Sequence, residues 1–351
     1  MARTTEMEKL PELHYHSFLA EAIRDYLDYL DHLGFRVVGP AYALGRLDRF
    51  LIDQHLESFD QHDPRWVMTR LVDQYQGRFK GQTLQAWRKA FQGLCRYLVR
   101  SGWMKENPLA DFPVPRPQPY RPYVFSPGEL RRFFDYLQQR IAPAAPAQAL
   151  YRAHCRYALY HLLYACGLRV SEAVHLAVAD YSAEQRTLYI RPSKFHKDRL
   201  IPIGSKAAAN LERLLSLRSD LGRPATRSAL FLKLPQREPY HRDWISRYFR
   251  EVLKHLGVYR PETCEQGCYY GTPHLHDLRR AFAVHRLLRW YREAANVDAK
   301  LPLLATYMGH GYFGHTKIYL TLTQELLNEA GQRFARRFDR LDWVSHDPQH
   351  R

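Results

Sequence analysis

Two arginines, a lysine, two histidines and a tyrosine stand out in the second half of the chain, because each lies in a distinctive local string. They are Arg169, Lys194, His276, Arg279, His310 and Tyr319. His276 and Arg279 are three positions apart, and Tyr319 follows His310 by nine. Together these groups can hold a phosphodiester, attack it and protonate the departing oxygen without a metal ion.

This chemistry suits the cutting and rejoining of DNA without an energy source. The energy of the phosphodiester must be kept, so the protein itself must become the temporary ester partner. A tyrosine hydroxyl can attack phosphorus and later leave again, since a phenol has a pKa near ~10. Guanidinium groups match the charged phosphate oxygens with parallel hydrogen bonds, and the departing 5′ oxygen needs a proton. The six residues therefore cover each step of a strand transfer.

The strings that hold these residues follow one another in a fixed order. They read CGLRVSE (166–172), SKFHKDRLIPIG (193–204), HLHDLRRAFAVH (274–285) and MGHGYFGHTKIYLTLT (308–323). In these strings and their order, the chain resembles the tyrosine recombinases, the phage integrase family. The resemblance covers the last two thirds of the chain at the level of motifs and is looser over the rest.

The resemblance implies a role for each reacting group. Arg169 ends the family's Gly-Leu-Arg motif and Arg279 closes His-x-Leu-Arg, so the two would form a paired clamp on the scissile phosphate. Lys194 aligns with the family's hairpin lysine, the implied general acid for the 5′ oxygen. Tyr319 is the implied nucleophile, which would form a 3′-phosphotyrosyl bond.

Three further residues have supporting roles by the same resemblance. His276 opens the His-x-x-Arg box and would take part in proton traffic around the nucleophile. His310 matches a position that is His or Trp in the family and helps to hold the phosphate. Glu172, three residues after Arg169, matches a family acidic position and would orient the site rather than react.

The chain departs from the family pattern beside two of these residues. The hairpin turn, commonly Gly-Lys-Gly, here has Ser and Phe around Lys194, which leaves Lys197 as a rival for the acid role. Arg280 stands where the family often has a histidine, and we expect it to add a DNA contact. Further DNA contacts are expected from basic residues of the N-terminal helices, the linker and the hairpin: Arg88, Lys89, Arg116, Arg121, Lys197 and Arg199.

The charge of the chain agrees with a DNA partner. Its 351 residues contain 52 Lys plus Arg against 36 Asp plus Glu, a net charge of +16. Such a basic protein usually meets a polyanion, because neutralised phosphates release counterions. No apolar run approaches the ~18 residues of a membrane span, and the first residues do not form a signal peptide. Five cysteines do not make a disulfide framework, which favours a reducing cytoplasm.

Helical spacing of apolar residues predicts an all-helical N-terminal domain over residues 1–110. One apolar face runs from Phe18 to Leu30, and Gly34 falls where a helix would end. Other apolar faces run over 44–51 and 84–98. The resemblance implies that this domain is the family's core-type DNA-binding domain, with a SAM-like fold.

Five prolines predict a semi-rigid linker, rather than a helix or strand, over residues 111–124. Directly after it, the sequence Ser-Pro-Gly-Glu at 126–129 is typical of a capping box that starts a helix. We therefore expect a catalytic domain over 125–325 and a C-terminal helix and tail over 326–351. This last helix either packs on its own domain or, as the resemblance implies, docks on a neighbouring protomer.

One short β segment interrupts the helical patterns of the catalytic domain. Residues 186–191 and 199–203 alternate in polarity and contain β-formers, which predicts a small hairpin with Lys194 in or beside its turn. The predicted fold class is therefore mainly α. It comprises a helical N-terminal domain and a mostly α catalytic domain with a small β-hairpin, which by resemblance is the tyrosine recombinase catalytic fold.

A second constellation competes for the same region. Cys264, Cys268, His274 and His276 lie within 13 positions and form a conceivable zinc set. Their spacing is unlike that of common zinc fingers, and His276 has a better-supported role. We therefore predict no metal site, and two ordinary loop cysteines are the plainer interpretation.

By resemblance, the partners are double-stranded DNA with inverted-repeat core sites and other copies of the chain. A dimer would bind each site and a tetramer would form the synapse, with strands exchanged through a Holliday junction and without ATP, metal or another cofactor. We expect a bacterial cytoplasmic protein associated with the nucleoid. Three alternatives stay open: a type IB topoisomerase, a non-catalytic DNA-binding protein of the same fold, and a zinc-dependent nuclease. The sequence does not separate integration, transposition and resolution.

Overall fold

The computed structural model describes most of the chain. The described residues are 14–60, 63–75, 81–113, 120–142, 145–191, 198–222, 229–234, 238–266, 268–293 and 295–310, with Tyr319, Asn328 and Gly331. The chain divides into two compact units, Met1–Gln118 and Pro119–Arg351. This division falls inside the proline-rich segment, and the finer domain limits stay a prediction.

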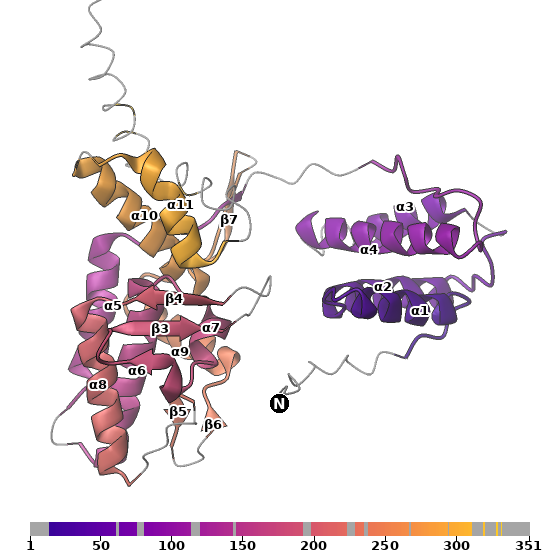
Figure 1. The fold of residues 1–351 in the computed structure, drawn as a ribbon. Coiled ribbons are helices and arrows are strands. Elements are labelled where there is room, and N and C mark those ends of the chain that lie inside the picture. The colour runs from indigo at the N-terminus through magenta and orange to yellow at the C-terminus, as the bar shows by residue number, and fades with distance from the viewer. Residues whose placement is uncertain are drawn as a thin grey trace, which may run out of the picture. The chain divides into compact units, whose positions relative to one another are not determined.

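The first unit consists of helices around one apolar core (Figure 1). They are α1 (Ala20–His32), α2 (Val38–Asp53), α3 (Pro64–Tyr75) and α4 (Gly81–Arg100). The apolar faces predicted from the spacing meet in this core, where Ile23, Leu44 and Leu94 are fully buried. Gly34 ends the first helix with φ +76°, and its N–H donates to the carbonyl oxygen of Asp31 at 2.8 Å.

The second unit is also mainly helical. Its helices are α5 (Pro127–Gln139), α6 (Ala147–Ala165), α7 (Val170–Val174), α8 (Ser205–Asp220), α9 (Arg242–His255), α10 (His276–Arg292) and α11 (Val297–Met308), with a short 3-10 turn at Val178–Asp180. The predicted capping box starts α5, since the Ser126 hydroxyl accepts from the Glu129 N–H at 3.2 Å and the Glu129 carboxylate accepts from the Ser126 N–H at 2.8 Å. Helix α6 lies at the centre and packs against α5, α8 and α10 (Figure 1).

A three-stranded antiparallel sheet contains the predicted hairpin. Its strands are β2 (Tyr181–Ser182), β3 (Thr187–Ile190) and β4 (Arg199–Pro202). The mainly α fold with a small hairpin is therefore confirmed, while β2 was not predicted. The turn that holds Lys194 and Lys197 lies outside the described residues. A further two-stranded pair, β5 (Leu232–Lys233) with β6 (Glu238–Pro239), precedes α9.

A second small sheet corrects the prediction of a linker without strands. Tyr120–Arg121, at the end of the proline-rich segment, form β1, which pairs in parallel with β8 (Cys268–Tyr270). Strand β8 pairs in turn with β7 (Thr263–Glu265). Tyr120 and Arg121 both keep a backbone N–H, and the proline after Arg121 favours extended backbone at that residue, so this dipeptide can still pair. Arg116 lies outside the described residues.

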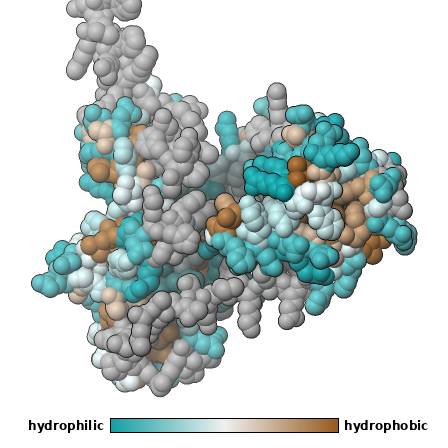
Figure 2. Space-filling view, turned by 45° about the vertical axis from the view of Figure 1, so that its right-hand side comes forward, coloured by the Kyte–Doolittle hydropathy of each residue, from teal (hydrophilic) through white to brown (hydrophobic). Residues whose placement is uncertain are grey.

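The surface seen in Figure 2 is mostly hydrophilic, and the apolar residues on it form patches interrupted by polar ones. None of the helices in the described ranges combines the length and the hydropathy that a membrane span requires.

Candidate active site

Arg169 lies at the start of α7, where three hydrogen bonds fix it. Its N–H donates to Glu172 Oε2 at 2.9 Å, and its Nη1 donates to Glu172 Oε1 at 2.6 Å. Its Nη2 donates to the carbonyl oxygen of Gly309 at 2.8 Å, which joins α7 to the end of α11. The side chain keeps 20% of its surface exposed, so an anion can still approach it.

Glu172 is the acidic centre of the site. Its side chain is fully buried and accepts hydrogen bonds from Arg169 and from Arg199, whose Nη1 and Nη2 lie 3.0 and 2.8 Å from the two carboxylate oxygens. Burial alone would raise the pKa of this carboxyl. The hydrogen bonds and charges of Arg199 and Arg169 outweigh burial and lower the pKa to about 2. Glu172 is therefore ionised and holds Arg169 and Arg199 in place.

Arg279 lies beneath these residues and is only 1% exposed. Its Nη1 donates to the carbonyl oxygen of Gly167 at 2.6 Å, and its Nη2 to that of Met308 at 2.7 Å. Burial and the neighbouring charge of Arg169 lower its pKa to about 10, so the guanidinium remains protonated at neutral pH. Arg279 thus places a positive charge under the site.

Two glycines make this arrangement sterically possible. Gly167 and Gly309 both have positive φ, +59° and +68°, which side chains with a Cβ rarely adopt. A Cβ on Gly167 would stand 2.4 Å from the Phe282 ring, and one on Gly309 would stand 2.7 Å from Nη1 of Arg199. Both glycines also offer their carbonyl oxygens to the arginines. These requirements explain why glycine is the first residue of the motifs Gly-Leu-Arg and Gly-His in this chain.

Arg199 corrects a prediction of the sequence, which expected it to contact DNA. Its side chain is only 10% exposed and its guanidinium holds Glu172, while its Nε donates to the carbonyl oxygen of Tyr307 at 2.9 Å. It therefore ties the first residue of β4 to α7 and α11. The sequence showed that Arg199 lies at the start of a hairpin strand, but this position does not determine whether its side chain points inward or outward.

Arg169, Arg199 and Arg279 form what we call the arginine cluster. In the described part of the chain they face one buried carboxylate, with the Arg279 Nη1 to Glu172 Oε2 distance at 4.0 Å. One carboxylate cannot neutralise three guanidinium groups, and positive charge in a poorly solvated site attracts an anion strongly. The cluster is therefore suited to a phosphate that carries developing negative charge.

His276 begins α10 beside the cluster. Its side chain is exposed, yet the surrounding protein atoms and the positive charges of Arg280 and Arg279 lower its pKa to about 4. It is therefore neutral at physiological pH and can accept or relay a proton. The next residue, Asp277, is fully buried, accepts from the His274 N–H at 2.8 Å and pairs with Arg280. Asp277 was not among the predicted site residues, and its place as an acidic residue in the first turn of α10 was the only signal in the sequence.

The structure brings His310 and Tyr319 together. Their ring centroids are 5.9 Å apart with an interplanar angle of 30°. Tyr319 is 5% exposed and packs in an apolar cluster with residues of α10 and α11, including Phe282 and Met308. Because Met308 also accepts a hydrogen bond from Arg279, the tyrosine and the arginine cluster share one wall.

The predicted DNA contacts have different environments. Arg88 is a correction: it is 8% exposed, and its Nη1 donates to the carbonyl oxygen of Phe112 at 2.7 Å, because the chain after α4 folds back over this helix. Lys89 and Arg121 are exposed, whereas Arg280 is partly buried against Asp277.

The two cysteines of the conceivable zinc set point to opposite sides of their hairpin. Cys264 pairs with Tyr269, and the adjacent residue Glu265 pairs with Cys268. Paired residues share a face and successive residues alternate, so Cys264 and Cys268 cannot bind one ion. Within the described residues, no group of three or more His, Cys, Asp or Glu side chains could hold a metal ion.

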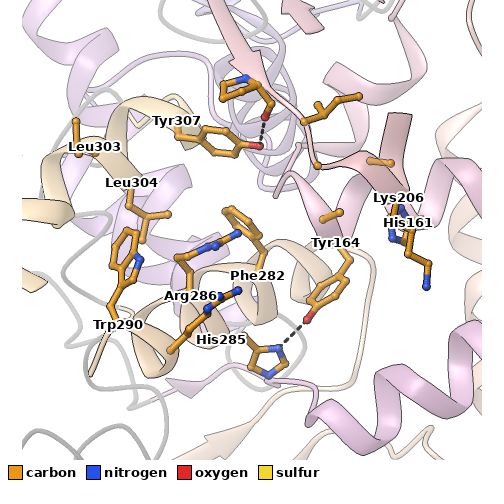
Figure 3. A pocket seen from close by; sticks show the side chains of 16 residues that line it. His161, Tyr164, Lys206, Phe282, His285, Arg286, Trp290, Leu303, Leu304 and Tyr307 are labelled. Carbon is orange, nitrogen blue, oxygen red and sulfur yellow. Dashed lines mark hydrogen bonds between the residues drawn. The ribbon is translucent and has the colours of Figure 1, made fainter. Parts of the chain in front are cut away.

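A cavity of about 720 Å³ lies between α6, α8, α10 and α11 (Figure 3). None of the candidate catalytic residues that the structure describes lines it. Its walls include Tyr164, whose hydroxyl lies 3.0 Å from Nδ1 of His285, and Tyr307, whose hydroxyl donates to the carbonyl oxygen of Pro202 at 3.0 Å. The volume of a cavity therefore does not identify the candidate active site in this chain.

The sequence is similar to those of known bacterial proteins. A putative integrase/recombinase of Sinorhizobium fredii (strain NBRC 101917 / NGR234) is 30% identical over 318 residues, which cover 90% of this chain and 96% of the relative. The tyrosine recombinase XerD of Brucella suis biovar 1 (strain 1330) is 28% identical over 248 residues, which cover 70% of this chain and 74% of XerD.

Solved structures with the same fold include the Tn1549 transposon integrase in complex with a circular intermediate DNA. It has a TM-score of 0.64 and 17% identity, covering 90% of this chain and 99% of that chain. A lambda integrase tetramer bound to a Holliday junction has a TM-score of 0.60 and 17% identity, covering 84% and 77%. The sequence model of the Phage integrase family matches residues 129–325, which include every one of the candidate catalytic residues. The chain belongs to the phage integrase family.

Proposed function

We propose that this chain is a site-specific DNA recombinase that cuts and rejoins strands through a 3′-phosphotyrosyl bond at Tyr319. One observation carries the proposal: three guanidinium groups share a single buried carboxylate on the wall against which Tyr319 packs beside His310. Such a site stabilises a phosphate under attack and presents a phenol to it.

In this mechanism, Arg169 binds a non-bridging oxygen of the scissile phosphate through its exposed edge. Both Nη atoms of Arg279 already donate to carbonyl oxygens, so Arg279 stabilises the phosphate through its positive charge. His276, which is neutral at physiological pH, handles the proton of the Tyr319 hydroxyl. Lys194, with Lys197 as its rival, protonates the 5′ oxygen that leaves.

The partners follow from the same reaction. Two copies of the chain bind one inverted-repeat site, and four form the synapse that exchanges strands through a Holliday junction. This assembly is supported by the lambda integrase tetramer on a Holliday junction and by the Tn1549 integrase on a circular intermediate DNA. The biological purpose of the reaction can be integration, transposition or resolution. The net charge of +16 supports contact with DNA. Since the relatives are bacterial, this contact would take place in the cytoplasm, at the nucleoid.

A covalent adduct tests the proposal. The substrate is duplex DNA from beside the chain's own gene, nicked so that cleavage releases a short fragment and traps the protein on the DNA. We expect an adduct that survives detergent, forms in EDTA and is absent with Tyr319→Phe. An adduct that persists in Tyr319→Phe would show a different nucleophile, and binding without any adduct would show a DNA-binding protein that lacks the reaction.

A further inference from the structure

The small sheet of β1, β8 and β7 has no part in the proposed reaction, yet it places basic and aromatic residues on one face. Arg121 is in register with Tyr270 across the parallel pair, and Thr263 is in register with Tyr270 across the antiparallel pair. Residues in register on neighbouring strands point to the same side of a sheet. Arg121, Tyr270 and Thr263 therefore share a face, while Tyr120 and Tyr269 share the other.

This face borders a pocket of about 200 Å³. Its other walls include Tyr123 and Arg260, from the end of the linker and from the segment before β7. The Arg260 side chain is 64% exposed, lies over the Tyr123 ring at 5.1 Å and donates from Nη2 to the Tyr123 hydroxyl at 3.3 Å. In the described part of the chain, no carboxylate lines the pocket, although Glu129 lies 3.7 Å from Arg260 behind it.

We propose that this pocket binds a backbone phosphate of the DNA duplex, with Arg121 and Arg260 as its ligands. The inference rests on the proposed function, because it takes DNA as the substrate. Two exposed guanidinium groups on one pocket match the oxygens of a phosphodiester with charge-assisted hydrogen bonds. The ion pair of Arg260 with Glu129 is long, at 3.7 Å, and although the Glu129 side chain is only 17% exposed, the Arg260 side chain stays 64% exposed, so its guanidinium can still meet an anion.

Pairing of the strands is what brings the two arginines together. Arg121 and Arg260 are distant in the sequence, and the Arg121 carbonyl oxygen accepts from the Gly271 N–H at 2.9 Å, which continues the pairing with β8. A backbone fixed in this way reduces the entropy that a phosphate contact would cost. The segment between α9 and α10 therefore holds the end of the linker in place through strand pairing, and the two arginines bind the DNA backbone.

Salt dependence of DNA binding provides the first test. The variants are Arg121→Gln, Arg260→Gln and their combination, and the control is Arg213→Gln, which removes an exposed arginine from α8, far from β7 in Figure 1. The affinity for duplex DNA is measured over a series of salt concentrations. We expect the double variant to reduce the slope of log affinity against log salt by about 0.9, the value for one phosphate contact, and the control to leave it unchanged. An unchanged slope in the double variant would overturn the proposal.

Neutral phosphate substitution provides the second test. Single methylphosphonates are placed along the duplex that forms the Tyr319 adduct. We expect one position at which the substitution weakens binding of the natural protein but has no further effect on the double variant. Equal weakening of both proteins at every position would mean that the arginines act only through general charge, which overturns the proposed contact. The adduct should still form at saturating DNA in all of these variants; its absence from the natural protein would instead count against the proposed function.

Discussion

At the scale of single residues, Glu172 connects the stability of the fold to its chemistry. Its pKa is about 2 in the folded chain against an ordinary value of 4.5. A carboxyl with a lowered folded-state pKa stabilises the fold above its unfolded-state pKa, and this contribution is lost as the pH falls toward the folded-state pKa. We expect Glu172→Gln to lower the free energy of unfolding by about 3 kcal/mol at pH 7, since it leaves buried guanidinium groups without their carboxylate.

Urea unfolding at a series of pH values measures this effect. The difference between the natural chain and Glu172→Gln should be full at pH 7 and shrink as the pH falls from about 4.5 toward about 2. The control is Glu184→Gln, an exposed carboxylate between β2 and β3, for which we expect a change within about 0.5 kcal/mol. A difference that stays constant with pH would show that the charge of Glu172 is not what stabilises the fold.

Arg199 provides a separate test, because it acts through other residues rather than on DNA. Arg199→Lys keeps the charge but cannot hold both Glu172 oxygens and the Tyr307 carbonyl at once. We expect the rate of adduct formation at saturating DNA to fall by about 10²-fold, as for a misplaced catalytic group, with DNA affinity nearly unchanged. Arg191→Lys, which alters an ion pair of a 60% exposed side chain directly after β3, should change the rate little. Equal losses of rate and affinity would identify Arg199 as a DNA contact after all.

The sequence predicts which residues react, and this stays a prediction, but it did not predict the directions of all the basic side chains. Arg199 begins a hairpin strand, where basic residues are usually exposed; it points inward because β4 lies beside α7 and the end of α11. Helical spacing placed Arg88 on a polar face, but the chain after α4 covers that face. In both cases the deciding contact comes from a segment that is distant in the sequence, and local periodicity does not encode such contacts.

At the scale of elements, the end of α11 determines where the arginine cluster can lie. Gly309 has a positive φ of +68°, and a Cβ there would meet the Arg199 guanidinium at 2.7 Å. We expect Gly309→Ala to cost about 1 kcal/mol of folding free energy from the backbone and, in addition, to reduce adduct formation by displacing Arg199. Gly222→Ala is the matched control, since Gly222 has φ +65° with nothing within 4 Å.

The two glycine variants separate strain from function. Both should lower the thermal midpoint through the shared backbone cost, Gly309→Ala by more because it also displaces Arg199, and only Gly309→Ala should slow cleavage. Similar rates of adduct formation in the two variants would show that Arg199 can move without affecting the site.

Elements with local signals were predicted and elements with long-range pairing were not. The capping box of α5 and the β3–β4 hairpin depend on residues within a few positions of each other, and both are present where the sequence predicted them. Strand β1 is two residues long and exists only because β8, far along the chain, lies next to it. A pattern of two residues carries no periodicity, so the proline-rich segment was interpreted as linker throughout.

At the scale of the whole molecule, the two units have separate apolar cores. We therefore expect a core substitution in one unit to leave the stability of the other nearly unchanged. Leu44→Ala, at a fully buried position in the first unit, should destabilise that unit by about 3 kcal/mol, the usual cost of a large cavity. Leu214→Ala, equally buried on α8, is the matched change in the second unit.

Hydrogen exchange, followed peptide by peptide, measures the stability of each unit in the intact chain. Leu44→Ala should raise exchange in α1, α2 and α4 but not in α6 or α8, and Leu214→Ala should do the reverse. Faster exchange in both units from either substitution would mean that the chain unfolds as one cooperative body. If the units are independent, Leu44→Ala should weaken DNA binding while the Tyr319 adduct still forms once DNA is saturating, because every residue of the proposed site belongs to the second unit.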